Sequence, residues 1–276
     1  MKKVLTIAGS DTSGGAGIQA DLKTFEERNT YGMSAITVIV AMDPDQAWSH
    51  QIFPVPIDTI KAQIKTALQG VGPDALKTGM LPTVEIIEYV GSLLKDLDIP
   101  LVIDPVLACK VNDGVPHNLF PENVEAMRKY LLPHASLVTP NDFEAAQLAG
   151  MDPIQNLDDA KEAAKRIHAL GAKNVVIKRR EGFGGDIAID LLYDGQDFIP
   201  MGAPKVPTKW THGAGCTYSA CITAELAKGH SVKEAVMTAK ALITRALEHS
   251  FALNQFVGPV DHTQLRANNN IDIKGR

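Results

Sequence analysis

Short apolar segments alternate with amphipathic segments along most of the chain. The apolar runs, rich in β-branched residues, lie at 2–9, 34–42, 73–79, 100–106, 135–141 and 173–179. Several are apolar throughout, as in strands that are covered on both faces. Between them, the segment 58–70 places Ile60, Ile64 and Leu68 on one helical face, and the segment ending at Gly171 repeats the pattern. The alternation predicts an α/β fold, with a central, mostly parallel sheet and helices on both faces.

Two later segments depart from this alternation. The stretch 186–201 alternates apolar and polar positions around an Asp194-Gly195 turn signal, which predicts a β-hairpin that we expect to form a flap. A long helix follows, with Ser231 as N-cap and Glu234 three positions later as a capping-box partner. The last residues, 266–276, are typical of a loose tail. Because no linker, repeat or low-complexity segment divides the chain, we expect one domain over 1–276.

Composition narrows the class of protein. The chain has 276 residues, 45% hydrophobic and 21% charged, with a formal net charge of -5 and a pI near 5.9. Binding to nucleic acid is not expected, because it normally requires clustered positive charge. The longest apolar run, 35–42, is far too short to span a membrane, and the N-terminus turns polar too early for a signal peptide, so we expect a cytoplasmic protein. Three cysteines without metal-ligand spacing indicate reduced thiols.

Candidate chemistry follows the ends of the predicted strands, where open parallel sheets bind ligands. After the first strand comes "AGSDTSGGAGIQADLKTF", a glycine loop that opens into a helix with Gln19 and Asp21 in its first turns. The loop matches neither the dinucleotide nor the Walker pattern. It is either a tight turn whose glycines allow positive φ or a binding loop.

Acidic residues follow two later strands. Asp104 ends one of them, and Asn141 and Glu144 follow the next. Carboxylates at strand ends can hold Mg²⁺ through water together with nucleotide phosphates. The same spacing also fits an N-cap Asn141 with Glu144 as its capping-box partner. Lys178 ends a further strand, where it either reaches a phosphate or is simply exposed.

The segment "THGAGCT" (211–217) combines small residues with a thiol at a predicted helix start. Free amides of Ala214, Gly215 and Cys216 would form an anion site suited to a transferring phosphoryl group. The same field would favour the thiolate of Cys216, which makes it a candidate proton acceptor or nucleophile. The alternative is a small buried residue that starts a helix. Cys221, one turn further, is expected in the core.

Five motifs together resemble a known family. They are "TIAGSDTSGGAGIQADLKTF", "KTGML", "DPV", "TPNxxEA" and "HGAGCT", in this order. The chain, over about residues 3–265, is similar to the ribokinase-like vitamin kinases of the pyridoxine kinase and hydroxymethylpyrimidine (phosphate) kinase group. This resemblance implies a ribokinase-like fold, use of ATP and Mg²⁺, phosphorylation of a hydroxymethyl group on a small heteroaromatic ring, and a homodimer.

The resemblance also implies roles for individual residues. Cys216 stands where most ribokinase-like enzymes carry a catalytic aspartate, so it is the candidate base, and the amides of the loop would stabilise the transferring phosphoryl group. The catalytic set is Gly213, Ala214, Gly215 and Cys216; the nucleotide set is Asn141, Lys178, Thr211, Gly213 and Gly215; the metal set is Asp104 and Glu144.

One local difference separates two substrates within the group. Pyrimidine kinases typically carry a glutamine that hydrogen-bonds the aminopyrimidine, whereas this chain has Met42, which cannot do so. The segments "AMD" and "WSH" resemble Gram-positive pyridoxal kinases, which implies pyridoxal, pyridoxine or pyridoxamine as substrate. Hydroxymethylpyrimidine, or both activities, is the alternative. The implied substrate-binding residues are Ser10, Asp11, Gln19, Asp21, Met42, His50, Gly79, Val106 and Cys109.

Two segments carry further expectations. Because a thiol adds reversibly to an aldehyde, Cys109, in a predicted lid over 107–117, is a candidate hemithioacetal anchor for pyridoxal; the alternative is an inert loop residue. After Lys178 the chain reads "RREGFGGD" where relatives carry a glycine-rich turn, so Arg179 and Arg180 either pair with phosphates or face water.

Two other classes of protein remain open. Cys216 with His212 or His50 could form the nucleophile and base of a cysteine hydrolase. This reading leaves Asn141, Glu144 and the first glycine loop without roles. A sensor that binds the vitamin without turnover is the other alternative.

Overall fold

The computed structural model describes residues 1–110, 116–118, 122–178 and 185–266, and of residues 108–110 and 116–118 it describes the backbone alone. The strands are β1 (Lys3–Asp11), β2 (Tyr31–Asp43), β3 (Ser49–Pro54), β4 (Ala75–Thr78), β5 (Leu101–Ile103), β6 (Ala108–Lys110), β7 (Pro116–Asn118), β8 (Leu137–Val138), β9 (Val175–Ile177), β10 (Ile187–Tyr193) and β11 (Phe198–Pro204). The α-helices are α1 (Gly17–Glu27), α2 (Ile57–Lys65), α3 (Val84–Leu94), α4 (Asn123–Tyr130), α5 (Asp142–Ala149), α6 (Leu157–Ala169), α7 (Ala214–Ala227) and α8 (Val232–Glu248). The helical elements also include a π-helical turn, η1 (Thr66–Val71), and two 3-10 turns, η2 (Leu132–His134) and η3 (His262–Leu265).

A nine-stranded sheet runs through the molecule in the order β11-β10-β9-β8-β5-β4-β1-β2-β3. The six strands from β9 to β2 are parallel, whereas β3 at one edge and the β10–β11 hairpin at the other are antiparallel. The expected mostly parallel sheet is therefore confirmed. The expected strands all form, and they are shorter or longer than predicted by a few residues at their ends.

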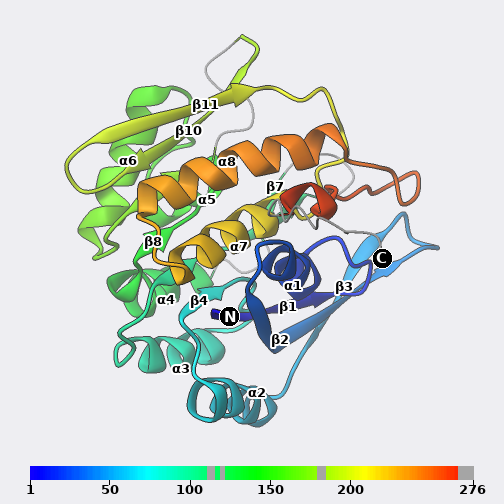
Figure 1. The fold of residues 1–276 in the computed structure, drawn as a ribbon, viewed down its shortest axis with the longest axis vertical. Coiled ribbons are helices and arrows are strands. Elements are labelled where there is room, and N and C mark those ends of the chain that lie inside the picture. The colour runs from blue at the N-terminus through cyan, green and yellow to red at the C-terminus, as the bar shows by residue number, and fades with distance from the viewer. Residues whose placement is uncertain (111–115, 119–121, 179–184, 267–276) are drawn as a thin grey trace, which may run out of the picture.

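Helices cover both faces of the sheet, as expected. Helices α1, α7 and α8 lie together on one face, in front of the sheet in Figure 1. The other face is covered by α2 to α6. On strand β5, Val102 packs against the layer of α7 and α8, whereas the next residue, Ile103, packs against the helices of the other face. Burial on both faces explains why these strands are apolar throughout.

Local sequence signals set several helix ends as predicted. Ser231 caps α8 in a capping box with Glu234, and Asn141 caps α5 in the same way with Glu144. Gly171 follows the C-cap of α6 with φ +111°, a conformation that favours glycine. These boundaries follow from residues within one turn of each other, which is why the sequence predicts them.

The hairpin expected at 186–201 is confirmed, and it is joined to the sheet, because β10 pairs with β9. Its closing as a flap stays a prediction. The sequence did not reveal β3, the edge strand that pairs Ser49–Pro54 with β2 and carries His50 opposite Met42. Among the described residues, none of the helices combines the length and apolar character needed to cross a bilayer. Of the tail, 267–276 lies outside the described residues.

Candidate active site

A small cavity of about 90 Å³ lies where β1 and β4 end and where α1 and α7 begin. It is the carboxyl edge of the parallel strands, the place where ligands bind in such sheets. The lining residues are Ala8, Gly9, Asp11, Ala16, Gly17, Asp21, Val40, Met42, His50, Lys77, Gly79, Met80, Val106, His212 and Cys216.

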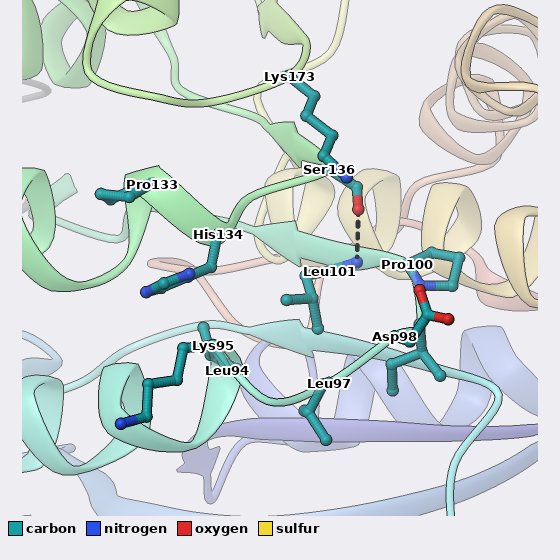
Figure 2. A pocket seen from close by; sticks show the side chains of 11 residues that line it. Leu94, Lys95, Leu97, Asp98, Pro100, Leu101, Pro133, His134, Ser136 and Lys173 are labelled. Carbon is teal, nitrogen blue, oxygen red and sulfur yellow. Dashed lines mark hydrogen bonds between the residues drawn. The ribbon is translucent and has the colours of Figure 1, made fainter.

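A larger hollow of about 410 Å³ lies at the opposite edge of the sheet, between the amino ends of β5 and β8 (Figure 2). There the amide of Leu101 donates to Ser136 Oγ at 3.1 Å. The two lysines of its rim, Lys95 and Lys173, point away from one another in Figure 2. None of the predicted site residues that the structure describes lines this hollow, so the smaller cavity is the candidate site.

The two glycine loops pack directly on each other at the cavity. Gly213 has φ +74°, and a Cβ at this position would lie 1.7 Å from the carbonyl oxygen of Gly15. A Cβ at Gly17, which has φ +58°, would lie 2.3 Å from the carbonyl oxygen of Gly9. Only glycine permits both the left-handed backbone and this approach. Close packing brings residues about 200 positions apart into one site, which favours the binding-loop interpretation of the first loop.

Asp11 and His212 join these two loops by a hydrogen bond. His212 Nε2 lies 2.7 Å from Asp11 Oδ2, and the same carboxylate accepts the amides of Ser13 and Ala16, each at 2.8 Å. Burial opposes ionisation of Asp11, but His212 and Ser13 outweigh it and lower the pKa of the carboxyl to about 2. Asp11 is thus an anion at neutral pH that holds the loop around it.

Ser10 and Gln19, two of the predicted substrate contacts, are not among the residues that line the cavity. Gln19 Nε2 donates to Ser10 Oγ at 2.8 Å, and Gln19 Oε1 accepts the amide of Asp11 at 3.0 Å. These bonds tie the end of β1 to the first turn of α1. Ser10 and Gln19 therefore stabilise the start of the loop and do not line the cavity.

Asp21 lies at the cavity but has both carboxylate oxygens engaged. Its side chain is 0% exposed, Oδ1 accepts from Lys77 Nζ at 2.8 Å, and Oδ2 accepts from Thr6 Oγ1 at 2.6 Å. Burial raises the pKa of Asp21, although Lys77 and Thr6 oppose this. Direct contact of this carboxylate with a substrate would require one of these bonds to be exchanged.

Cys216 lines the cavity in the first turn of α7, as the sequence predicts. The expectation that its thiolate is favoured is wrong for the free protein. Burial raises the pKa of the thiol to about 12, although Lys77 and the amide of Gly17 favour the anion. The helix terminus and its neighbours do not compensate for the loss of water around the sulfur. Cys221 is buried in the core, as expected.

The start of α7 retains the character of an anion site. Its first turn contains no acidic residue, and the opening amides of a helix have no acceptor within the helix. One predicted free amide is not free, because Ala214 donates to the carbonyl oxygen of Thr211 at 3.2 Å. Lys178 approaches the loop, since its Nζ lies 3.4 Å from where a Cβ of Gly215 would be. A phosphate held here would meet both backbone amides and a cation.

Lys178 also belongs to a buried network of opposite charges. Its Nζ donates to Asp104 Oδ1 at 2.9 Å, and Asp104 accepts further hydrogen bonds from Thr139 and Ser219, each at 3.0 Å. Burial opposes ionisation of Asp104, but Lys178 and Lys77 outweigh it and lower the pKa of the carboxyl. The lysine is therefore partly buried and paired, unlike an idle exposed lysine.

Glu144 and Asn141 form the capping box that was the structural alternative for this motif. Asn141 Oδ1 accepts the amide of Glu144 at 2.9 Å, and Glu144 Oε2 accepts the amide of Asn141 at 2.9 Å. Burial raises the pKa of Glu144 to about 7, helped by the charge of Asp104 and opposed by Lys178. Near neutral pH, Glu144 is thus close to the midpoint between its two protonation states.

Asp104 and Glu144 fit a Mg²⁺ ion only as partners through water. All four carboxylate oxygens already accept hydrogen bonds, from Lys178 and Thr139, from Ser219, from Leu107 and from Asn141. Among the described residues, no three acidic, histidine or cysteine side chains gather as a metal-ligand group. Mg²⁺ commonly keeps several waters and takes its other ligands from phosphates. The donor set suits that mode and not a site built of protein ligands alone.

One wall of the cavity is apolar and comes from the edge of the sheet. Met42, Val106 and Ile52 pack against the buried cluster that contains Val40 and Met80. This wall offers contact to the carbon face or edge of a ring and no donor to a ring nitrogen.

His50 lies on β3, directly opposite Met42 in the strand register, and lines the cavity. Burial lowers the pKa of His50, with the neighbouring His212 adding to this and Asp11 opposing it. Its imidazole is therefore kept neutral more readily than a free one.

The lid residues are described only in part. Cys109 lies on β6, opposite His117 of β7. The side chain of Cys109, on which the covalent hypothesis depends, is outside the described residues, as are 111–115, Arg179 and Arg180. The roles expected for Cys109, Arg179 and Arg180 therefore stay predictions.

Sequence reasoning missed Lys77 and Met80 as cavity residues and gave His212 no part in linking the loops. The signal for Lys77 was available, since a lysine stands inside a short apolar strand. For the other two there was none, because their contacts are formed only by folding. The hydrolase interpretation lacks its nucleophile–base contact, because no hydrogen bond joins the thiol of Cys216 to a histidine among the described side chains, and the Nε2 atom of His212 faces Asp11.

Similarity to known proteins extends over nearly the whole chain. The sequence matches the family model described as phosphomethylpyrimidine kinase over residues 11–261. It is 55% identical over 269 residues to the pyridoxine kinase of Bacillus subtilis, covering 97% of this chain and 98% of that protein. An ADP complex of Bacillus subtilis pyridoxal kinase has a TM-score of 0.91 at 55% identity, with 97% of this chain and 100% of that chain covered. Staphylococcus aureus pyridoxal kinase in complex with AMP-PCP and pyridoxal has a TM-score of 0.87 at 49% identity, with 96% and 94% covered. Because the family model spans residues 11–261 and these relatives cover nearly the whole chain, the chain has a ribokinase-like fold and belongs to the phosphomethylpyrimidine kinase family.

Proposed function

We propose that this chain is an ATP-dependent kinase that phosphorylates the 5′-hydroxymethyl group of pyridoxal, pyridoxine or pyridoxamine in the salvage of vitamin B6. The observation that carries the proposal is the shared cavity of Cys216 and Met42. One wall presents a thiol beside an anion-binding helix terminus, and the other presents an apolar surface with no donor for an aminopyrimidine. The named relatives support the same substrate class.

The phosphoryl group of ATP is assigned to the start of α7. The amides of Gly215 and Cys216 and the ammonium of Lys178 would stabilise the negative charge of the transferring group. Thr211 and Asn141 remain assigned to the nucleotide. Asp104 and Glu144 would hold a Mg²⁺ ion through water, and this ion would neutralise charge on the nucleotide phosphates when bound.

The acceptor ring is assigned to the cavity between Met42, His50 and the loop of Gly79. Its hydroxymethyl oxygen would lie between the Cys216 sulfur and the phosphoryl position. There the oxygen would bond to phosphorus, the bond from phosphorus to the leaving oxygen of ADP would break, and the hydroxyl proton would pass to the thiolate of Cys216. Because burial raises the pKa of this thiol to about 12 in the free protein, the role of base requires that the charges around the loaded site favour its thiolate.

The experiment is ADP release from Mg-ATP with pyridoxal, pyridoxine or hydroxymethylpyrimidine as acceptor. We expect turnover on the two pyridines and a loss of at least about 100-fold in Cys216→Ala. Cys221→Ala is the matched control, because Cys221 is a buried cysteine on the same helix whose pKa burial also raises to about 12, but it does not line the cavity. Its turnover is expected within about threefold of wild type. Preference for the pyrimidine would refute the substrate, and vitamin binding without turnover would favour the sensor.

A homodimer, a cytoplasmic location and the covalent role of Cys109 are further parts of the proposal. The homodimer follows from the family resemblance, and unpaired thiols at Cys216 and Cys221 suit a reducing compartment. For Cys109, an unchanged affinity for pyridoxal in Cys109→Ala would exclude the hemithioacetal.

A further inference from the structure

Lys77 is a fully buried lysine in the middle of the sheet. All four residues of its strand, β4, are buried, and its own side chain is 0% exposed. Its ammonium is paired with Asp21 at 2.8 Å, and the carboxylate is completed by the hydroxyl of Thr6 at 2.6 Å. Burying two charges costs more than their attraction commonly recovers, so such a pair is weak support for a role in stability. Strongly perturbed ionisable groups beside a cleft are candidates for function.

Tertiary packing brings this pair to the candidate base. Helix α7 packs on both α1 and β4, the elements that carry Asp21 and Lys77, and all three side chains line one cavity. Gly79 leaves room at this point, because a Cβ there would lie 2.8 Å from the Cβ of Ala8 and 3.8 Å from Lys77 Nζ. The ammonium therefore lies next to Gly79, one of the glycines in the wall of the cavity that Cys216 also lines.

The charges around the thiol differ in sign and come from several elements. Burial raises the pKa of Cys216, and Lys77 is the strongest influence against this. Asp21 and Asp104 also raise the pKa of Cys216, while Lys178 interacts favourably with the thiolate. Burial likewise opposes the charge of Lys77, but Asp21, Cys216 and Asp104 outweigh it and raise the pKa of Lys77. Lys77 thus stays a cation in an interior that otherwise opposes ions.

We propose that Lys77 is a positioning residue for the phosphoryl transfer, whose ammonium, fixed by Asp21, stabilises the ionised form of Cys216. The thiolate accepts the proton of the acceptor hydroxyl, the hydroxyl oxygen bonds to phosphorus, and the bond from phosphorus to the leaving nucleotide oxygen breaks. The assignment rests on the proposed function for its purpose. Its physical content, the ionisation of one thiol, is measurable without any substrate.

The test is the rate of alkylation of Cys216 by iodoacetamide at pH 9, in metal-free protein without nucleotide, read by mass spectrometry of the peptide that contains Cys216. The rate follows the thiolate fraction, and one pKa unit corresponds to a tenfold change in it. In Lys77→Met, which keeps length and removes charge, we expect alkylation to be slower by about tenfold or more. Wild-type alkylation in this variant would overturn the proposal.

A double variant and a control separate charge from structural damage. Asp21→Asn with Lys77→Met replaces the pair by neutral groups of similar shape, so it tests the charge even if the single variant does not fold. The double variant is expected to be alkylated more slowly than wild type, but by less than Lys77→Met, because Asp21 itself opposes the thiolate and its influence is weaker than that of Lys77. A wild-type rate would overturn the proposal. Lys240→Met is the control, because Lys240 pairs with Asp190 at 3.0 Å in a mostly buried position away from the cavity. Equal slowing in Lys240→Met would assign the effect to loss of any ion pair.

The kinase reaction supplies a second readout. The pH at which kcat reaches half its maximum should rise by about one unit in Lys77→Met and stay unchanged in Lys240→Met, with KM for ATP little altered. Unmoved pH profiles in a variant with slow alkylation would overturn the catalytic purpose of Lys77. Absence of kinase turnover in the wild type, with the alkylation pattern intact, would instead refute the proposed function alone.

Discussion

Replacing Gly213 by alanine tests whether the close contact between the two glycine loops is needed to hold the phosphoryl site at the start of α7. Gly213 has φ +74°, and its missing Cβ would lie 1.7 Å from the carbonyl oxygen of Gly15, a backbone atom that cannot rotate away. The left-handed backbone alone costs about 1–2 kcal/mol with a side chain. To relieve the contact, the loops must separate by about 1 Å or more, a displacement that can lower a rate about 100-fold. In barrier height this corresponds to about 2.7 kcal/mol.

Gly229→Ala is the matched control for this substitution. Gly229 lies just beyond the other end of α7 with φ +94°, and nothing lies within 4 Å of its missing Cβ. It should lose about 1–2 kcal/mol of unfolding free energy from backbone strain and keep its turnover. The assays are urea unfolding and ADP release with pyridoxal. The reasoning is refuted if Gly213→Ala keeps kcat within about threefold of wild type, or if Gly229→Ala loses as much kcat.

The remaining predictions concern specificity and pH. Met42→Gln restores the donor and acceptor of the pyrimidine kinases, so we expect kcat/KM to shift from pyridoxal toward hydroxymethylpyrimidine by about tenfold or more; no shift in paired assays would contradict this. Glu144 has its pKa raised from 4.5 to about 7, so wild type loses stability as pH rises from about 4.5 to 7. When unfolding is measured without metal, the stability of Glu144→Gln should not fall over this pH range. Parallel curves of stability against pH for wild type and variant would contradict the assignment. His262, bonded to Thr217, has its pKa lowered from 6.5 to about 4 by burial, so its stabilisation is present above 6.5 and is lost as pH falls toward 4. The stability difference from His262→Gln should therefore shrink over that range by up to about 3 kcal/mol, and a constant difference would contradict the assignment.

Much of the fold could be predicted because its signals are local or periodic. The capping boxes at Ser231 and Asn141 join residues three positions apart, and the apolar runs mark buried parallel strands wherever they pair. The edge strand β3 escaped prediction, because its residues are largely exposed and only pairing with β2 makes them a strand. That strand then places His50 opposite Met42.

The candidate site, like the fold, has features that the sequence predicts and features that only folding decides. The motif order locates the loops, the thiol and the acidic strand ends, since each is a short stretch of sequence. The ionisation of Cys216 could not be inferred, because the helix start that favours the anion is local, whereas the burial that outweighs it comes from the whole fold. Asp21 was expected at the ring, yet its pairing with Lys77 joins residues 56 positions apart.

The sequence by itself therefore determined the fold class, the family and the residue types available for chemistry. The tertiary structure alone decided which charges meet, which hydroxyls and amides are already engaged, and how far water is removed from the thiol. Patterning reports what each residue prefers within a few neighbours, whereas pKa values and close contacts depend on the distances to residues far along the chain. Gly213 against Gly15 and Lys77 beside Asp21 are both contacts of this second kind.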